Sequence, residues 1–154
     1  RCKLTKTDRR VRNFGRLFFV LYMLAALYFM FLSETLDRSM VSKNYRYNLT
    51  LFKEITRFWD MRHTYGWNVT IVNLVGNVIC FMPFGFLIPT ISKKKICKNV
   101  ISVTLLAMLF SLGIETAQLL LKVGAFDVDD IFLNTIGGFL GYVTMKFTRV
   151  RKHI

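Results

Sequence analysis

Apolar and polar residues alternate in long blocks along this chain. Four apolar segments, at residues 14–33, 68–91, 99–121 and 131–147, are separated by shorter stretches that are rich in charge. A helix rises 1.5 Å per residue, so about 20 residues cross a hydrocarbon layer of about 30 Å. The pattern therefore predicts an all-α membrane protein in which four transmembrane helices form a single domain over residues 1–154.

The polar stretch between the first two segments contains a different pattern. Between residues 51 and 60 the apolar side chains recur at helical spacing and the charged ones lie on the opposite face. The apolar set is Leu51, Phe52, Ile55, Phe58 and Trp59, and the charged set is Lys53, Glu54, Arg57 and Asp60. This predicts an amphipathic helix. It suits both the outer leaflet of the membrane and the top of the helix bundle, and the sequence favours neither placement.

Charge orients the predicted helices. The chain is 53% hydrophobic yet has 22 Lys and Arg against 9 Asp and Glu, a net charge of +13. The basic residues lie between apolar segments and not along one face, which argues against a nucleic-acid partner. By the positive-inside rule, the more basic side of the membrane is cytoplasmic. That side holds 15 of the 22: Arg1, Lys3, Lys6, Arg9, Arg10, Arg12, Arg16, Lys93, Lys94, Lys95, Lys98, Lys146, Arg149, Arg151 and Lys152. We therefore expect a multi-pass cell-membrane protein with both termini in the cytoplasm and residues 34–67 and 122–130 outside.

Glu115 is the only charged residue between Lys98 and Lys122. A carboxylate at the centre of a membrane helix costs about 2.5–3.5 kcal/mol on insertion scales, so such a residue normally faces protein or water. On the predicted topology, six further polar residues share its depth near the outer surface. They are Asn73, Asn77, Gln118, Asp127, Asp130 and Asn134. We expect these seven residues to form one outward-facing ligand-binding pocket.

A purely structural role is the alternative for these residues. Asp127 and Asp130 fit a helix N-terminus, where acidic side chains stabilise by about 0.3–1 kcal/mol each. Asn73 and Asn77 fit hydrogen bonds between helices. This reading explains single residues better than it explains their common depth. The glycines look structural too, because Gly137 and Gly141 present a small face that permits close helix approach.

Motifs for catalysis and metal binding are missing from the sequence. There is no Ser/His or Cys/His arrangement, no HExxH and no phosphate-binding loop. We therefore expect no cofactor and no metal, and we assign no catalytic residue.

The ordered polar motifs resemble those of the VanZ-like family, which is named for teicoplanin resistance. They are Asn73-Leu-Val-Gly-Asn77, Phe81-Met-Pro83-Phe-Gly85, Ser111-Leu-Gly-Ile-Glu115-Thr-Ala-Gln118 and the run from Gly124 through Asp127, Asp130 and Asn134 to Gly138, together with Asn48-Leu-Thr-Leu-Phe-Lys-Glu-Ile55 before the second segment. The resemblance covers about residues 14–145. Two positions depart from it. Leu51 stands where many members have Pro, and Ala125 where many have Arg, which leaves Lys122 as the candidate basic partner for the aspartates.

The resemblance implies a small membrane protein that contributes to resistance against lipoglycopeptides such as teicoplanin. We expect the polar pocket to engage a membrane lipid, a lipid-linked envelope precursor or the antibiotic itself. An intramembrane enzyme is the alternative, in which carboxylates modify a lipid-linked envelope substrate. A transporter is disfavoured, because the predicted inner half has only small hydroxyls and a thiol. The sequence leaves open whether the chain forms a homo-oligomer.

Overall fold

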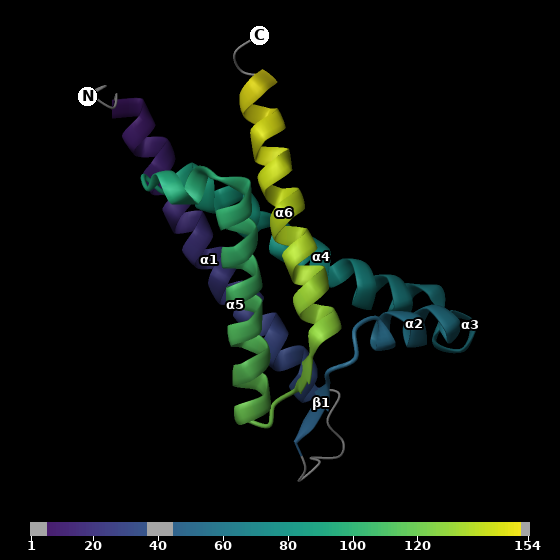
Figure 1. The fold of residues 1–154 in the computed structure, drawn as a ribbon. Coiled ribbons are helices and arrows are strands. Elements are labelled where there is room, and N and C mark those ends of the chain that lie inside the picture. Colours follow the sequence, from purple (N-terminus) through teal and green to yellow (C-terminus); the bar gives the residue numbers. More distant parts are fainter. Residues whose placement is uncertain (1–5, 37–44, 152–154) are drawn as a thin grey trace.

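The computed structural model describes residues 6–36 and 45–151, and helices dominate both stretches. Figure 1 shows α1, α5 and α6 along the long axis, while α2, α3 and the first half of α4 project to one side. The elements in chain order are α1 (Lys6–Leu36), β1 (Arg46–Asn48), α2 (Lys53–Asp60), α3 (Arg62–Tyr65), α4 (Trp67–Ile91), the 3₁₀ helix η1 (Lys95–Lys98), α5 (Val100–Leu120), β2 (Ala125–Asp127) and α6 (Val128–Arg151). Arg1, Lys3 and Lys152, which entered the topology prediction, lie outside the described residues, as does the loop at 37–44.

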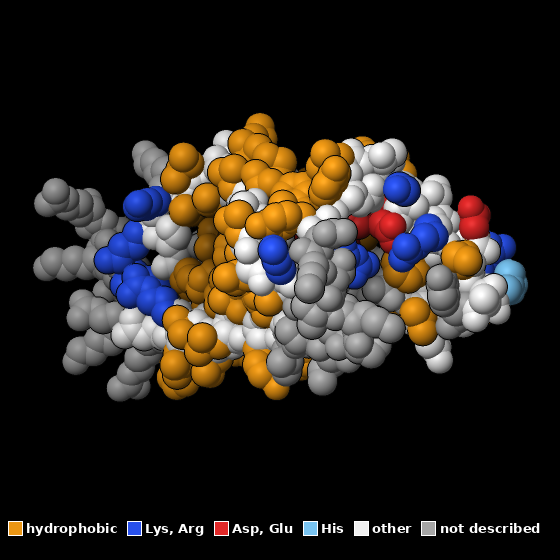
Figure 2. Space-filling model, turned by 90° about the horizontal axis from the view of Figure 1, so that it is seen from below, with side chains coloured by type: hydrophobic (Ala, Val, Ile, Leu, Met, Phe, Trp, Pro, Cys, Tyr) orange, Lys and Arg blue, Asp and Glu red, His pale blue; other side chains and the backbone are white. Residues whose placement is uncertain are grey.

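Three helices of the described chain are long and apolar enough to cross a membrane. The spans are Arg12–Phe31 in α1, Trp67–Ile91 in α4 and Val100–Leu120 in α5. Large apolar side chains on these helices are exposed, including Phe14, Val72 and Leu109. Figure 2 shows hydrophobic side chains across the middle of one face, with basic side chains toward both ends and acidic ones toward one of them. Such a surface is unusual for a soluble monomer and ordinary for a protein surrounded by lipid. The helices are therefore those of a membrane protein.

The fourth predicted span falls in α6, which is not among these three helices. Three glycines and Asn134 lower its hydropathy, although α6 is long enough to cross. These small and polar residues pack against protein: Asn134, Gly137, Gly138 and Gly141 are all buried. A helix that is enclosed by neighbouring helices can cross a membrane without presenting an apolar surface to lipid. That α6 crosses the membrane as a fourth span stays a prediction.

The closest packing in the fold is between α4 and α6. A Cβ added at Gly85 would overlap the backbone of Gly138, and one added at Gly141 would overlap the carbonyl of Met82. Gly137 meets the carbonyl of Val78 in the same way. The predicted close approach at Gly137 and Gly141 is therefore confirmed, because only a residue without a side chain permits it. Beside this contact lies an aromatic core in which the Phe84 and Phe110 rings stack at 5.2 Å.

The predicted amphipathic segment forms α2, which lies against other parts of the protein. The Thr70 hydroxyl of α4 donates to the Phe58 carbonyl at 3.2 Å. The ring of Phe52, just before α2, meets that of Phe132 in α6 edge-on, with 5.3 Å between centroids. Trp59 remains 53% exposed, so α2 also presents an aromatic side chain outward. Its placement in the outer leaflet stays a prediction.

The packing of α4 on α6 gives a direct test. Gly85→Ala should destabilise the protein by about 1–3 kcal/mol, because the two backbones must separate. Gly76→Ala in the same helix is the matched control, since a Cβ there meets nothing within 4 Å and alanine favours helix. Thermal unfolding in detergent, followed by circular dichroism, should show a lower Tm for Gly85→Ala alone. Equal Tm values for both variants would contradict this packing.

Candidate functional site

A short parallel strand pair positions the polar residues. Arg46, Tyr47 and Asn48 of β1 pair with Ala125, Phe126 and Asp127 of β2. The pair joins the segment before α2 to the turn between α5 and α6, 79 residues away in sequence. The Asn48 side-chain amide donates to Asp127 Oδ1 at 3.0 Å and so adds a side-chain bond to the pairing. The sequence did not predict these strands, because each contains only three residues.

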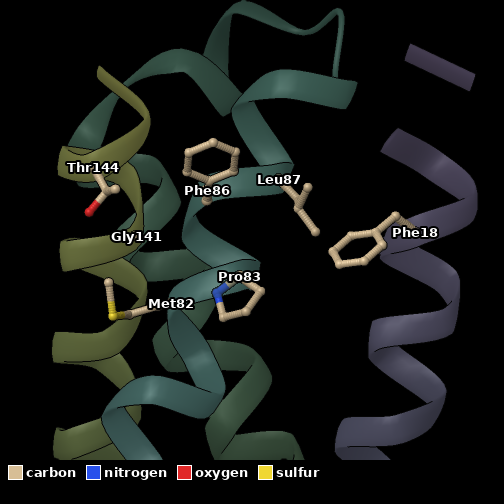
Figure 3. Close-up of a pocket in the computed structure, with 7 residues that line it drawn as sticks. All are labelled: Phe18, Met82, Pro83, Phe86, Leu87, Gly141 and Thr144. Carbon is tan, nitrogen blue, oxygen red and sulfur yellow. The ribbon is translucent and has the colours of Figure 1, made fainter. Parts of the chain in front are cut away.

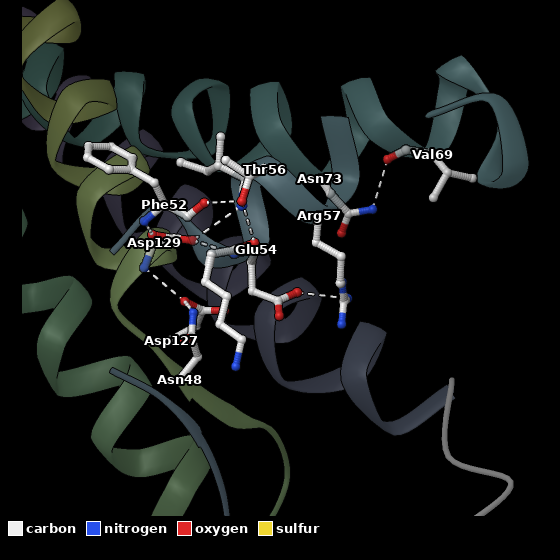
Figure 4. Close-up of polar contacts among 11 residues, drawn as sticks. Asn48, Phe52, Glu54, Thr56, Arg57, Val69, Asn73, Asp127 and Asp129 are labelled. Atoms are coloured by element: carbon white, nitrogen blue, oxygen red, sulfur yellow. Dashed lines mark hydrogen bonds and ion pairs between the residues drawn. The ribbon is translucent and has the colours of Figure 1, made fainter. Parts of the chain in front are cut away.

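Asp129 holds the N-terminus of α2 with its carboxylate, and the sequence did not single it out. It is 1% exposed and accepts hydrogen bonds from the backbone N–H groups of Phe52, Glu54 (2.8 Å) and Ile55 (3.2 Å). Figure 4 shows these bonds converging on its two oxygens. The residue before α2, Phe52, has φ 66° and supplies no side-chain cap. A carboxylate from α6 therefore replaces the usual N-cap and complements the positive end of α2.

Asp129 escaped prediction because it lies off the face shared by Asp127, Asp130 and Asn134. Two signals were available in the sequence: three aspartates within four residues, and a predicted helix at Lys53 preceded by Leu51-Phe52 instead of a capping residue. Only the fold brings the two signals together.

Glu115 is buried in protein, with 1% of its surface exposed. Its Oε2 accepts a hydrogen bond from the backbone N–H of Asp127 at 3.0 Å. Asp127 Oδ1 in turn accepts from the N–H of Asp129 at 2.8 Å. On the neighbouring face, the Asn77 amide of α4 donates to Asp130 Oδ1 at 2.5 Å. We name Glu115, Asp127, Asp129 and Asp130 the carboxylate junction, since together they connect α2, α4, α5 and α6.

The remaining predicted residues lie at different distances from this junction. Asn134 is fully buried and donates to the Ser111 hydroxyl at 2.9 Å, linking α6 to α5, while its own Oδ1 has no hydrogen-bond partner. The Gln118 amide donates to the Met30 carbonyl of α1 at 2.9 Å. Asn73 is exposed, and its amide donates to Val69 within α4. Six of the seven residues thus bond between elements, Glu115 among them, whereas the bond from Asn73 to Val69 lies within its own helix.

The suggested role of Lys122 as a basic partner for the aspartates is not what the structure shows. Its Nζ lies 4.7 Å from the centre of the Tyr45 ring. Lys122 also follows the end of α5, with a φ of 53°. Its N–H donates to the carbonyl of Leu119, and the N–H of Val123 donates to the carbonyl of Gln118. This is a Schellman ending with lysine where glycine is usual.

The surroundings of Asp127 shift the pKa of its carboxyl group. Burial raises the pKa of its carboxyl, and the nearby charges of Asp129 and Glu54 raise it further, while hydrogen bonds from the Asp129 N–H and Asn48 oppose the shift. Carboxyl groups held at different proton affinities are a requirement of acid–base chemistry. In the described residues, no group of three or more His, Cys, Asp or Glu side chains is arranged to hold a metal ion.

The two neighbouring aspartates should respond differently to substitution by asparagine. Asp129→Asn should cost about 1–2 kcal/mol, since an amide offers one acceptor oxygen to three N–H groups. Asp127→Asn should lower the free energy of unfolding by less than that, or raise it. The pKa of Asp127 is higher in the folded protein than in the unfolded chain, so its ionised form opposes folding at neutral pH. Thermal unfolding at pH 7 compares them, and a larger loss for Asp127→Asn would refute this reading.

Comparison with known proteins agrees with this arrangement of motifs. The chain is similar to Protein VanZ of Enterococcus faecium, with 37% identity over 68 residues, which is 44% of this chain and 40% of that protein. The match thus spans less than half of the enterococcal protein. No solved structure matches the chain. The pattern of the VanZ/LLP1 family matches residues 19–149, which include every residue of the carboxylate junction. The chain belongs to the VanZ/LLP1 family.

Proposed function

We propose that this protein contributes to teicoplanin resistance from within the cell membrane. Its carboxylate junction and the adjoining α2 would form an outward-facing site that engages an envelope lipid, a lipid-linked precursor or the antibiotic. Engagement there would reduce access of the lipoglycopeptide to its target. Family membership and the apolar helices support the general role, and the site is our inference from the polar contacts.

The strongest support is the bonding of Asp129 to the N-terminus of α2. Asp129 also bonds to Asp127, so this contact joins one of the polar residues expected from sequence to a helix with an exposed tryptophan, Trp59. Tryptophan is favoured at membrane–water interfaces, where its ring contacts both lipid and headgroups. A ligand with a lipid tail and a polar head would meet both kinds of surface at this place.

The orientation proposed from charge puts this site outside the cell. The exposed basic residues Arg16, Lys93, Lys94 and Lys146 belong to the end that we assign to the cytoplasm. The carboxylate junction lies at the opposite ends of α5 and α6, near Leu120 and Val128. A site on the outer side would be open to an antibiotic that reaches the cell from outside.

Resistance assays with isosteric variants test this proposal. Expressed in a susceptible Gram-positive host, the chain should raise the inhibitory concentration of teicoplanin more than that of vancomycin, because a membrane-surface mechanism favours the lipid-bearing drug. Glu115→Gln and Asp130→Asn should abolish the increase. Each variant removes a charge and keeps an oxygen that can accept the bond from Asp127 N–H or the Asn77 amide.

Asp60→Asn is the matched control, since it makes the same chemical change at an exposed position of α2. Immunoblotting of membrane fractions establishes equal protein levels. Resistance that persists in Glu115→Gln and Asp130→Asn at equal levels would show that the carboxylates are not responsible.

A second function is supported by the raised pKa of Asp127 beside other carboxylates. An intramembrane enzyme would use one protonated and one ionised carboxyl as general acid and base on a lipid-linked envelope substrate. Mass spectrometry of envelope precursors, with and without the protein, distinguishes the two functions. Catalysis predicts a new or altered precursor that disappears in Asp127→Asn, whereas binding alone predicts an unchanged profile.

A further inference from the structure

An apolar groove opens between α1, α4 and α6, away from the carboxylate junction. It has a volume of about 300 Å³ and is lined by Phe18 of α1, by Met82, Pro83, Phe86 and Leu87 of α4, and by Gly141 and Thr144 of α6. In Figure 3, Phe18 and Leu87 point toward one another across the space between α1 and α4. The volume lies at the lower end of the range for small-molecule sites.

The lining of the groove offers hydrocarbon contacts and no free donor. Thr144 is the one hydroxyl among the seven lining residues, and it donates to the Leu140 carbonyl at 2.8 Å. Phe18 and Thr144 are both exposed, so the groove is open at the molecular surface. Side chains that line an open apolar groove gain dispersion contacts when another apolar group packs against them. In a membrane, the hydrocarbon chains of lipids can make these contacts.

Positive charge lies at one end of the groove. A Cβ on Gly15 would lie 2.9 Å from Ile91, so α1 at this level meets the last residue of α4. Exposed Lys93 and Lys94 follow directly, and Leu87 is only about 6 Å of helix rise from Ile91. A molecule extending out of the groove past Ile91 would therefore reach Lys93 and Lys94.

We propose that this groove holds one acyl chain of an anionic phospholipid, whose headgroup phosphate is bound by Lys93 and Lys94. The apolar walls fit the chain, and the basic residues complement the charge at the depth where a headgroup lies. This site is separate from the outward-facing site proposed above and does not depend on that function. It would bind a lipid of the leaflet that faces the basic end of the protein.

Native mass spectrometry of the full chain in detergent tests the proposal. Titration with phosphatidylglycerol and phosphatidylcholine should show retention of one lipid, with phosphatidylglycerol held more tightly. Thr144→Trp, which places an indole in the groove, should abolish retention of both lipids. Thr148→Trp is the matched control, because Thr148 is one turn further along α6, is equally exposed and makes the same bond to its own helix, yet does not line the groove.

Substitution of the basic residues tests the headgroup contact without altering the groove. Lys93→Gln and Lys94→Gln should each weaken phosphatidylglycerol binding roughly fivefold and leave phosphatidylcholine unchanged, since each basic residue near an anionic surface contributes about 1 kcal/mol. Lys53→Gln, an exposed lysine of α2 at the other end, should change neither. These variants also decide the matter if Thr144→Trp does not fold.

Three results would overturn the proposal. Undiminished lipid retention in folded Thr144→Trp would exclude the groove as the site. Equal effects of Lys93→Gln and Lys53→Gln would show that attraction is general and not local. A lipid-free dimer that Thr144→Trp dissociates would show that the groove receives a second copy of the chain.

Discussion

The backbone contact between α4 and α6 is the constraint on which the rest of the structure depends. Glycines at Gly85, Gly137 and Gly141 let the two helices approach until backbone meets backbone. That approach sets the distance at which Asn77 reaches Asp130 at one end of the contact. It also leaves the groove beside Met82 and Gly141 at the other end. Larger side chains along this face would separate the helices and remove both features, because packed interiors transmit small changes in volume.

Enclosing several carboxyl groups is costly, and the fold offsets that cost with backbone donors. Asp129 receives three N–H groups that the first turn of α2 would otherwise leave unsatisfied. Glu115 receives one from the end of β2, the backbone N–H of Asp127. Each of these bonds satisfies a helix end or strand end and a buried carboxylate together. The carboxylate junction is therefore structural, and the framework that positions α2 includes Asp127, a carboxyl group whose pKa is raised by burial.

The two ends of the molecule differ in chemistry. One end brings together carboxylates, an aromatic helix and paired strands, and the other brings together lysines, arginines and an apolar groove. Arg57 and Glu54 form an ion pair on the surface of α2, where water limits such a pair to a small stabilisation. The two ends would therefore meet different ligands. The carboxylate junction would face the outside, and the apolar groove would face lipids of the other leaflet.

Hydropathy and charge by themselves determined that this chain is a helical membrane protein, because apolar length and basic bias are local properties. The motifs around Glu115, Asp127 and Asn134 likewise identified the family and most of the polar residues that bond between elements. Tertiary structure alone decided that Asp129 caps α2, that β1 pairs with β2, and that Asn73 bonds within its own helix. Each of these depends on contacts between residues far apart in the chain or on the direction in which α4 projects. Shared depth along parallel helices does not specify which side chains face one another, and for that reason the sequence grouped seven residues that the fold distributes among several contacts.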